Sequence, residues 1–307
     1  MRDILMALND IFGAHHSQAL TTWFNQQTLR QATIDEQVVS LFDVEQTAIT
    51  AAIKRVMSFV PLSAGQLVEH TFLVPALDTR QLDLECVARF RSSFYAHVLC
   101  ASAQVNIDSA GIVKHGDTFE RYGHDKHVIH KPLKDNPSNE RVAAYINGSV
   151  EETGYTFSVV LNQHELEGVK HSHIQTLFNG ALPYEEKEWD DVYLSAVFER
   201  LLDEEAFAYL SGILDDNAVG VLKAVSEFNA ERYKKHNKDK TKVYSSYGKL
   251  IAVKKHRFSA MDRVNQKRIA TPKLKLVASN NSQKSTSVNS DTSTTQLDDI
   301  AHDFGGF

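Results

Sequence analysis

The spacing of apolar residues changes twice along this chain, and that change constrains its fold more than any other feature. Up to about residue 60 the spacing is helical, as in the helix-favouring run at 48–57. In 82–91, LDLECVARFR, apolar and polar residues alternate with the two-residue period of a half-buried strand. Arg89 and Arg91 are therefore expected to leave the same, non-core face.

Three more strand-like runs follow a short helix candidate at 93–102. They span 105–114, 142–150 and 155–161, and the spacing becomes helical again from Gln163 onwards. This order predicts an α+β fold in which a small, mainly antiparallel β-sheet packs with helices.

Charge divides the chain into parts that its net charge of −6 conceals. Residues 1–231 hold 17 Lys and Arg against 33 Asp and Glu, whereas 232–276 hold 15 against 2. We expect an N-terminal helical region at 1–68, an α+β core at 69–231, a basic arm at 232–276, and a flexible polar linker with an acidic C-terminal tip at 277–307. Such basic density is typical of segments that bind a polyanion. The alternative is an arm that folds back on the acidic body.

Several classes of function lack their sequence signals. No apolar run is long enough to span a bilayer, and the N-terminus has no signal-peptide core, so a cytoplasmic location is expected. Cys86 and Cys100 lie in apolar settings without paired spacing, and we expect both to be reduced core residues. His124, His127 and His130 fall three apart, which on a strand puts neighbours on opposite faces, so no metal site is expected.

Enzyme signatures are also missing. The nearest fragment to a phosphate-binding loop is SSYGKL, and there is no dinucleotide-binding, serine-hydrolase or zinc-protease motif. The acidic run EEKEWDD at 185–191 is interpreted as a solvated helix start. A metal-dependent nuclease that uses acids between Glu185 and Asp216 stays an alternative, although no spacing supports a two-metal site. We expect a protein that is not an enzyme and has no cofactor.

Cations and aromatic residues gather around the strand-like runs. Lys and Arg bind phosphates with little demand on sequence, and unpaired bases stack on aromatic side chains. The candidate DNA-binding residues of the core are Arg89, Phe90, Arg91, Lys114, Arg121, Lys126, His130 and Lys131, and those of the basic arm are Lys234, Lys235, Lys254, Lys255 and Arg257. The alternative is that they form solvated strand edges, with Phe90 and Tyr122 in the core.

Residues 104–132, QVNIDSAGIVKHGDTFERYGHDKHVIHKP, resemble the central signature of the RecT/Redβ family of phage single-strand annealing proteins. In that family a strand ending in a basic residue leads into G-D-x-F, an acidic-basic hairpin and I-H-[RK]-P. The upstream TFLVPALDTRQLDLECVARFRS and the downstream EWDDVYLSAVFERLL are similar to flanking segments of that family, so the resemblance covers about residues 70–205. The residues transferred by position are Arg91, Lys114, His130 and Lys131.

The chain departs from the family pattern at two places. The glycines that flank the family's aromatic-basic pair are Arg89 and Ser92 here. The basic positions of the family's late helix are Leu194, Ser195 and Glu199, so that helix is not carried over as a phosphate clamp.

The resemblance implies an ATP-independent protein of the bacterial host cytoplasm that coats single-stranded DNA and anneals complementary strands in homologous recombination. It implies a homo-oligomer, as a ring or a helical filament, and no cofactor beyond the Mg²⁺ that accompanies DNA. The implied partners are single-stranded DNA, the annealed duplex, a phage-type exonuclease, and host single-stranded DNA-binding or repair proteins, with no membrane. A passive protein that protects single strands without pairing them is the alternative.

The C-terminal tip, LDDIAHDFGGF, is similar to the end of bacterial single-stranded DNA-binding proteins, whose acidic tip and terminal Phe dock on repair enzymes. An aromatic side chain beside a terminal carboxylate suits a small apolar pocket with a basic rim. The candidate partner-binding residues are Asp298, Asp299, Asp303, Phe304 and Phe307. The alternative is a disordered terminus that only adds solubility.

Overall fold

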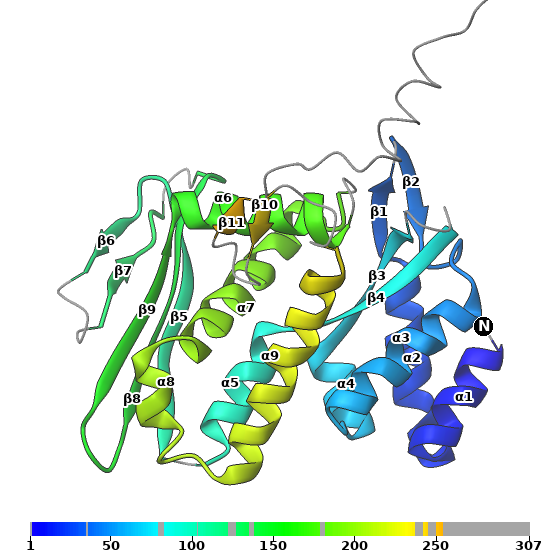
Figure 1. Cartoon of the computed structure of the whole chain (residues 1–307), viewed down its shortest axis with the longest axis horizontal. Helices are drawn as coiled ribbons and strands as arrows, with labels where there is room; N and C mark the ends of the chain where they lie inside the picture. Colours follow the sequence, from blue (N-terminus) through cyan, green and yellow to red (C-terminus); the bar gives the residue numbers. More distant parts are fainter. Residues whose placement is uncertain are drawn as a thin grey trace, which may run out of the picture. The chain divides into compact units, whose positions relative to one another are not determined.

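The computed structural model describes residues 2–34, 36–78, 83–102, 104–121, 127–134, 138–178, 182–236, 242–244 and 250–253. All of them belong to one compact unit, Met1–His256. They form an α+β fold of helices and small antiparallel sheets, which confirms the fold class predicted from the sequence (Figure 1).

The N-terminal part is helical, with one hairpin inserted. Its elements are α1 (Arg2–Phe12), the 3-10 turn η1 (Ala14–His16), α2 (Ser17–Thr28), β1 (Gln31–Ile34), β2 (Gln37–Ser40), α3 (Gln46–Phe59) and α4 (Ala64–His70). The helical prediction is confirmed except at β1 and β2, where a tight turn with Glu36 at φ 67° reverses the chain. Ala32 and Ile34 of β1 are buried, so packing against the core stabilises a strand there.

A second hairpin leads into the middle of the chain. β3 (Thr71–Asp78) pairs antiparallel with β4 (Asp83–Phe90), and α5 (Ser92–Cys100) follows. β4 is the strand predicted at 82–91, but every residue from Cys86 to Phe90 is buried. The prediction of one exposed face is therefore wrong for the second half of this strand.

The main sheet has three strands in the order β5-β8-β9. These are β5 (Val105–Lys114), β8 (Arg141–Val150) and β9 (Thr156–Asn162), all paired antiparallel. Their bounds lie within one or two residues of the runs predicted from alternation. Between β5 and β8 the chain forms the small hairpin of β6 (Thr118–Glu120) and β7 (Ile129–Lys131).

Helices form most of the remainder. The elements are α6 (Gln163–Ser172), the π-helical turn η2 (His173–Leu177), the 3-10 turn η3 (Glu186–Glu188), α7 (Trp189–Leu202), α8 (Glu205–Leu210), α9 (Asp216–His236), β10 (Lys242–Tyr244) and β11 (Leu250–Val253). The sequence predicts one buried face for the helix at 189–202, and the structure confirms it. The buried residues of this face are Trp189, Val192, Tyr193, Ala196, Val197 and Leu201.

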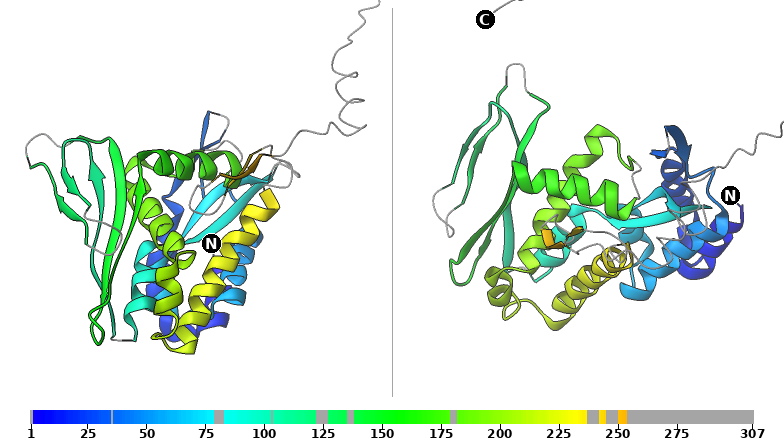
Figure 2. Two further views of the ribbon diagram at one scale, coloured as in Figure 1. Left: turned by 60° about the vertical axis from the view of Figure 1, so that its left-hand side comes forward. Right: turned by 45° about the horizontal axis from the view of Figure 1, so that its top comes forward.

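The two faces of the main sheet are covered differently. Ala144 and Ile146 of β8 belong to the large core shared with the helices, whereas Ala143 and Tyr145 belong to a small second cluster with Val113. Figures 1 and 2 show α5, α6 and α7 on one side of the sheet and the β6–β7 hairpin beside the other. The sheet thus holds the hairpin away from the main core.

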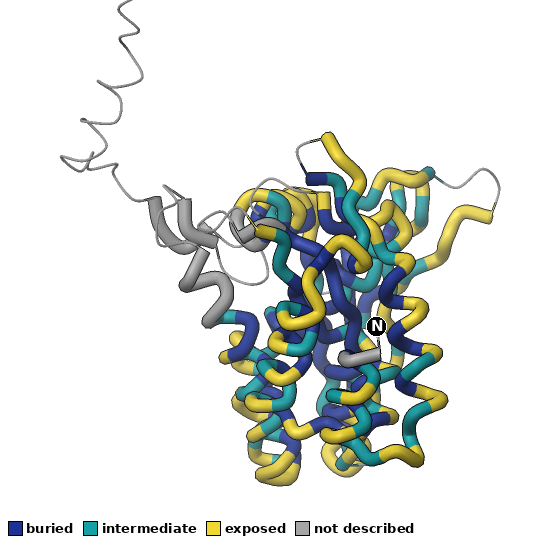
Figure 3. Tube along the Cα trace, turned by 90° about the vertical axis from the view of Figure 1, so that its right-hand side faces the viewer, coloured by how far each residue is buried: buried dark blue, intermediate teal, exposed yellow. Residues whose placement is uncertain are grey.

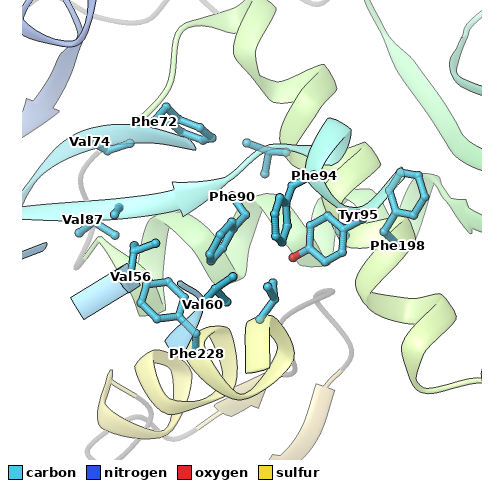
Figure 4. Packing of buried hydrophobic residues seen from close by; sticks show 14 of the residues in the cluster. Val56, Val60, Phe72, Val74, Val87, Phe90, Phe94, Tyr95, Phe198 and Phe228 are labelled. Carbon is cyan, nitrogen blue, oxygen red and sulfur yellow. The ribbon is translucent and has the colours of Figure 1, made fainter. Parts of the chain in front are cut away.

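One hydrophobic core runs through the described residues from Ile4 of α1 to Phe228 of α9. Figure 4 shows its centre, where Phe90 and Phe94 stack and Phe228 meets Phe90 edge-on. Along the helices in Figure 3, buried and exposed positions alternate, as amphipathic helices require. In the part of the chain that the structure describes, no helix is both long and apolar enough to cross a membrane.

The two cysteines differ. Cys86 of β4 is buried, as predicted, but Cys100 at the end of α5 is exposed, so its assignment to the core is wrong. Both are free thiols.

Candidate nucleic-acid interface

Asp117 fastens the β6–β7 hairpin to the end of β5. The chain turns at Gly116, whose φ of 95° favours glycine. The Asp117 Oδ2 atom accepts a hydrogen bond of 2.8 Å from the backbone N–H of Lys114, and Oδ1 accepts one of 2.8 Å from the N–H of Leu133. One carboxylate therefore joins the two ends of the hairpin.

His130 completes this anchor. Its Nε2 lies 2.9 Å from Asp117 Oδ2, and its Nδ1 lies 3.3 Å from the Tyr145 hydroxyl. Burial alone would raise the pKa of Asp117, but the hydrogen bonds from Leu133, Lys114 and His130 outweigh it and lower this pKa to about 2. The carboxylate is thus ionised and can only accept, so His130 Nε2 donates. With its side chain 8% exposed, His130 holds the hairpin, and its role as a DNA contact stays a prediction.

Asn147 of β8 fastens the other part of the hairpin segment. Its Oδ1 accepts from the N–H of Val128 and its Nδ2 donates to the carbonyl of Val128, both at 2.9 Å. Nδ2 also donates to Ser109 Oγ at 2.9 Å, and Ser158 Oγ donates to Oδ1 at 3.0 Å. The amide thus pairs with Val128 as a neighbouring strand would. Sequence reasoning missed this residue, although a buried asparagine within an alternating apolar run was a usable signal.

Anchored in this way, the hairpin presents cations to solvent. Arg121 and Lys131 are exposed, Lys134 follows just beyond β7, and Lys114 at the end of β5 is half-buried. Ile129 is exposed beside them, which adds an apolar contact surface.

The structure corrects the assignment of Arg89 and Phe90, which are 4% and 2% exposed. The Nη1 atom of Arg89 donates to Asn229 Oδ1 at 3.3 Å, and its Nη2 lies 3.9 Å from Glu199 Oε1. Glu199 Oε1 also accepts from the Tyr95 hydroxyl at 3.0 Å. A buried guanidinium is stabilised by such partners, which lie on α7 and α9, more than 100 residues further along the chain. Neither side chain can meet a DNA strand in this arrangement.

Arg91, directly after β4, has a different environment. It is half-buried, and its guanidinium carbon lies 5.4 Å from the centroid of the Phe72 ring. Arg30 approaches the same ring at 4.7 Å. Burial lowers the pKa of Arg30, and Arg91 lowers it further, against the opposing effect of Glu188. Both arginines therefore lie against the Phe72 ring, and Arg30 is also ion-paired with Glu188.

The acidic run at 185–191 lies among cations from distant parts of the chain. Its ion pairs with them are Arg30–Glu188, Arg141–Glu186 and Arg141–Asp190. Asp191 accepts from the backbone N–H of Ser92 at 3.0 Å and also from the Ser92 hydroxyl, at the start of α5. The run is a helix start with Glu185 and Glu186 exposed, as interpreted from the sequence, but it also joins Arg30, Arg141 and Ser92 around the N-terminus of α7.

These contacts bring two predicted residues to one part of the molecule. Lys114 of β5 pairs in the strand register with Arg141 of β8, and Arg141 bonds to the start of α7. Arg91 precedes Ser92, which bonds to Asp191 in the same turn of α7. Arg91 and Lys114 therefore both border the N-terminus of α7. Sequence reasoning missed Arg30 and Arg141 because their partners are 158 and 45 residues away.

Ion pairing separates the cations of the described residues into two groups. Arg30, Arg89, Arg141 and Arg200 each face a carboxylate. A second group has no ion-pair partner among the described residues. It includes Arg91, Lys114, Lys131, Lys134 and Lys170, and also Lys54 on α3 and Lys223 on α9. The Nζ atom of Lys170 lies 5.6 Å from the centroid of the Trp189 ring. We call Arg91, Lys114, Lys131, Lys134 and Lys170 the open cations. They come from the hairpin and from elements around the start of α7.

The hollows of the surface lie elsewhere. One of about 520 Å³ is lined by His15, His16 and Trp23 beside α2, and another of about 250 Å³ lies between α3 and β4. Across the described ranges, no group of three or more His, Cys, Asp or Glu side chains is arranged to hold a metal ion.

The remaining predicted residues cannot be placed on this surface. Lys234 and Lys235 lie in the last part of α9, of which only the backbone is described. The predicted residues that fall outside the described residues are Lys126, Lys254, Lys255, Arg257, Asp298, Asp299, Asp303, Phe304 and Phe307.

Comparison of the chain with protein-family models, with curated proteins and with solved structures found no match. The resemblance to single-strand annealing proteins therefore rests on the sequence motifs alone.

Proposed function

We propose that this chain is an ATP-independent single-stranded DNA-binding protein that anneals complementary strands in homologous recombination. The observation that carries the proposal is the group of open cations. Arg91, Lys114 and Lys131 have no ion-pair partner among the described residues, although the acidic body offers many carboxylates. Cations left without a carboxylate are available for phosphates.

The chemistry of this surface supports a mechanism in which the protein holds the backbone and leaves the bases free. Phe90 lies in the core, so it cannot stack on bases, and the open cations offer contacts to phosphates. A strand held through its phosphates keeps its Watson–Crick edges available to an incoming strand. The protein then selects a polyanion of suitable shape, and base pairing selects the sequence.

The sequence motifs add the partners to this proposal. The basic arm at 232–276 supplies further phosphate contacts, because the body around the open cations is acidic. Following the family resemblance, copies of the chain line up on DNA as a ring or filament and act beside a phage-type exonuclease, and the acidic tip docks on a host repair protein.

Salt dependence of binding tests the site. Arg91→Ala/Lys131→Ala removes two phosphate contacts, so the slope of log K against log salt for a single-stranded oligonucleotide is expected to become shallower by about 1.4. The matched control is Lys54→Ala/Lys223→Ala, which removes two exposed lysines from α3 and α9. An unchanged slope in the first variant, or an equal change in the control, would refute the assignment of the open cations.

A different assay separates annealing from passive protection. Binding of single strands without faster pairing of complementary oligonucleotides would support a protective single-stranded DNA-binding protein, and shortened strands would support a nuclease. Accelerated pairing without ATP supports annealing.

A further inference from the structure

Glu186 and Asp190 hold Arg141 next to the open cations. The Nη1 atom of Arg141 pairs with Glu186 and its Nε with Asp190, and its Nη2 donates to the Glu186 carbonyl at 2.6 Å. Lys114 is the register partner of Arg141 on the neighbouring strand. Arg141 thus lies where it could contact a further phosphate, but its guanidinium is paired with two carboxylates of its own chain.

The exposure of these carboxylates makes the ion pairs exchangeable. The side chain of Glu186 is 66% exposed and that of Asp190 is 40% exposed. The Arg141 side chain between them is 12% exposed, but water and salt reach the two carboxylates and compete for these pairs, which limits their contribution to stability. The Arg89–Glu199 pair is the opposite case, because both side chains are buried and breaking it would leave an unpaired charge inside the core.

A phosphate can replace a carboxylate on arginine with similar geometry. Both groups offer two oxygens to the planar guanidinium, and both form charge-assisted hydrogen bonds. A strand that is already held at Lys114 raises the local concentration of phosphate beside Arg141. Until then, the two carboxylates repel other anions from the same place.

We propose that Glu186 and Asp190 are a built-in competitor for phosphate at Arg141, which makes this face select a strand with several phosphates over isolated anions. The proposal rests on the proposed binding of single-stranded DNA and adds a residue and a selection step to it. A single nucleotide contacts too few cations to displace the carboxylates, whereas a strand engages Lys114 and its neighbours first.

The test compares a charge-neutralised variant with a matched control. Glu186→Gln/Asp190→Asn releases Arg141. Asp203→Asn/Glu205→Gln makes the same change in charge near the other end of α7, at two exposed carboxylates that pair with no arginine among the described residues. A fluorescent oligo-dT strand is titrated at a series of NaCl concentrations. One additional phosphate contact is expected to steepen the slope of log K against log salt by about 0.7, which corresponds to about fivefold tighter binding at 0.1 M salt.

A further variant assigns the gain to Arg141. Adding Arg141→Ala to the neutralised variant is expected to return the slope to that of the unmodified protein. A slope that stays steep in this triple variant, or a gain no larger than that of the control, would overturn the proposal. Because Glu186 is exposed, Glu186→Gln alone keeps α7 folded and is expected to change binding in the same direction.

The same titrations separate this inference from the proposed function. If the unmodified protein binds oligo-dT and the neutralised variant binds with the same slope, the competitor is refuted and DNA binding stands. If the unmodified protein does not bind oligo-dT even at low salt, both proposals are refuted.

Discussion

Replacing Asp117 by asparagine is expected to loosen the β6–β7 hairpin by about 2 kcal/mol. Its two oxygens accept hydrogen bonds from the N–H groups of Lys114 and Leu133 and from His130, at 2.8 to 2.9 Å. Asparagine has one acceptor oxygen, and its NH₂ group would face at least one of these donors in either orientation.

The pKa of Asp117 gives an independent estimate of that free energy. A pKa that falls from about 4 in the unfolded chain to about 2 in the folded protein corresponds to at most about 2.5 kcal/mol. The turn lies at the surface, so solvent screening brings the figure to about 2 kcal/mol. Because the folded pKa is lowered, this stabilisation is complete above pH 4 and disappears as the pH falls towards 2.

Hydrogen exchange followed by mass spectrometry measures this effect locally. At neutral pH, amides of the described hairpin segments 115–121 and 127–134 are expected to exchange about 30-fold faster in Asp117→Asn than in the unmodified protein. In urea unfolding, the stability difference between the two proteins is expected to vanish as the pH approaches 2. The control is Asp108→Asn, which weakens a half-exposed pair with His127 at 3.2 Å. Its remaining amide oxygen can still accept the exposed hydrogen bond from Ser149 Oγ, so the expected cost is less than about 0.5 kcal/mol. Equal exchange in Asp117→Asn and in the control would show that Asp117 does not anchor the hairpin.

Four further substitutions test other parts of the account. Gly148→Ala would place a Cβ 2.2 Å from the Phe157 ring and is expected to lower the free energy of unfolding, measured by thermal unfolding, by about 2 kcal/mol. Gly220→Ala lies in an open part of α9, where alanine favours the helix, and is expected to raise the free energy of unfolding by about 0.5 to 1 kcal/mol. Asn147→Ala removes both hydrogen bonds to Val128 and is expected to lower the free energy of unfolding in urea by about 2 kcal/mol or more. It is also expected to increase proteolysis of the hairpin, and an unchanged cleavage rate would show that Asn147 does not fasten this segment. Arg89→Ala leaves a carboxylate buried without its cation and is expected to cost about 3 to 5 kcal/mol in urea unfolding, while a surface DNA contact would leave stability unchanged.

The sequence predicts the elements of this fold better than it predicts their surroundings. The strand at Val105–Lys114 is predicted without error in its bounds, because alternation and flanking turns are local signals. The hairpin of β1 and β2 is missed because its strands have four residues each and lie within a segment of helical spacing.

The candidate site shows the same limit. Alternation placed Arg89 and Arg91 on one exposed face, but partners on α7 and α9 enclose Arg89, and no local pattern reveals them. For the acidic run at 185–191, composition predicts exposure, whereas its contacts with Arg30 and Arg141 depend on how distant strands and helices pack. Charge that is paired across the fold can be recognised only in the structure.

The most direct test of the central claim is the rate at which two complementary oligonucleotides pair, one carrying a fluorophore and the other a quencher. Without ATP or Mg²⁺, the unmodified protein is expected to accelerate quenching, and Arg91→Ala/Lys131→Ala to lose most of that acceleration while Lys54→Ala/Lys223→Ala keeps it. Pairing no faster than without protein, or equal acceleration by the Arg91→Ala/Lys131→Ala variant, would contradict annealing at the open cations.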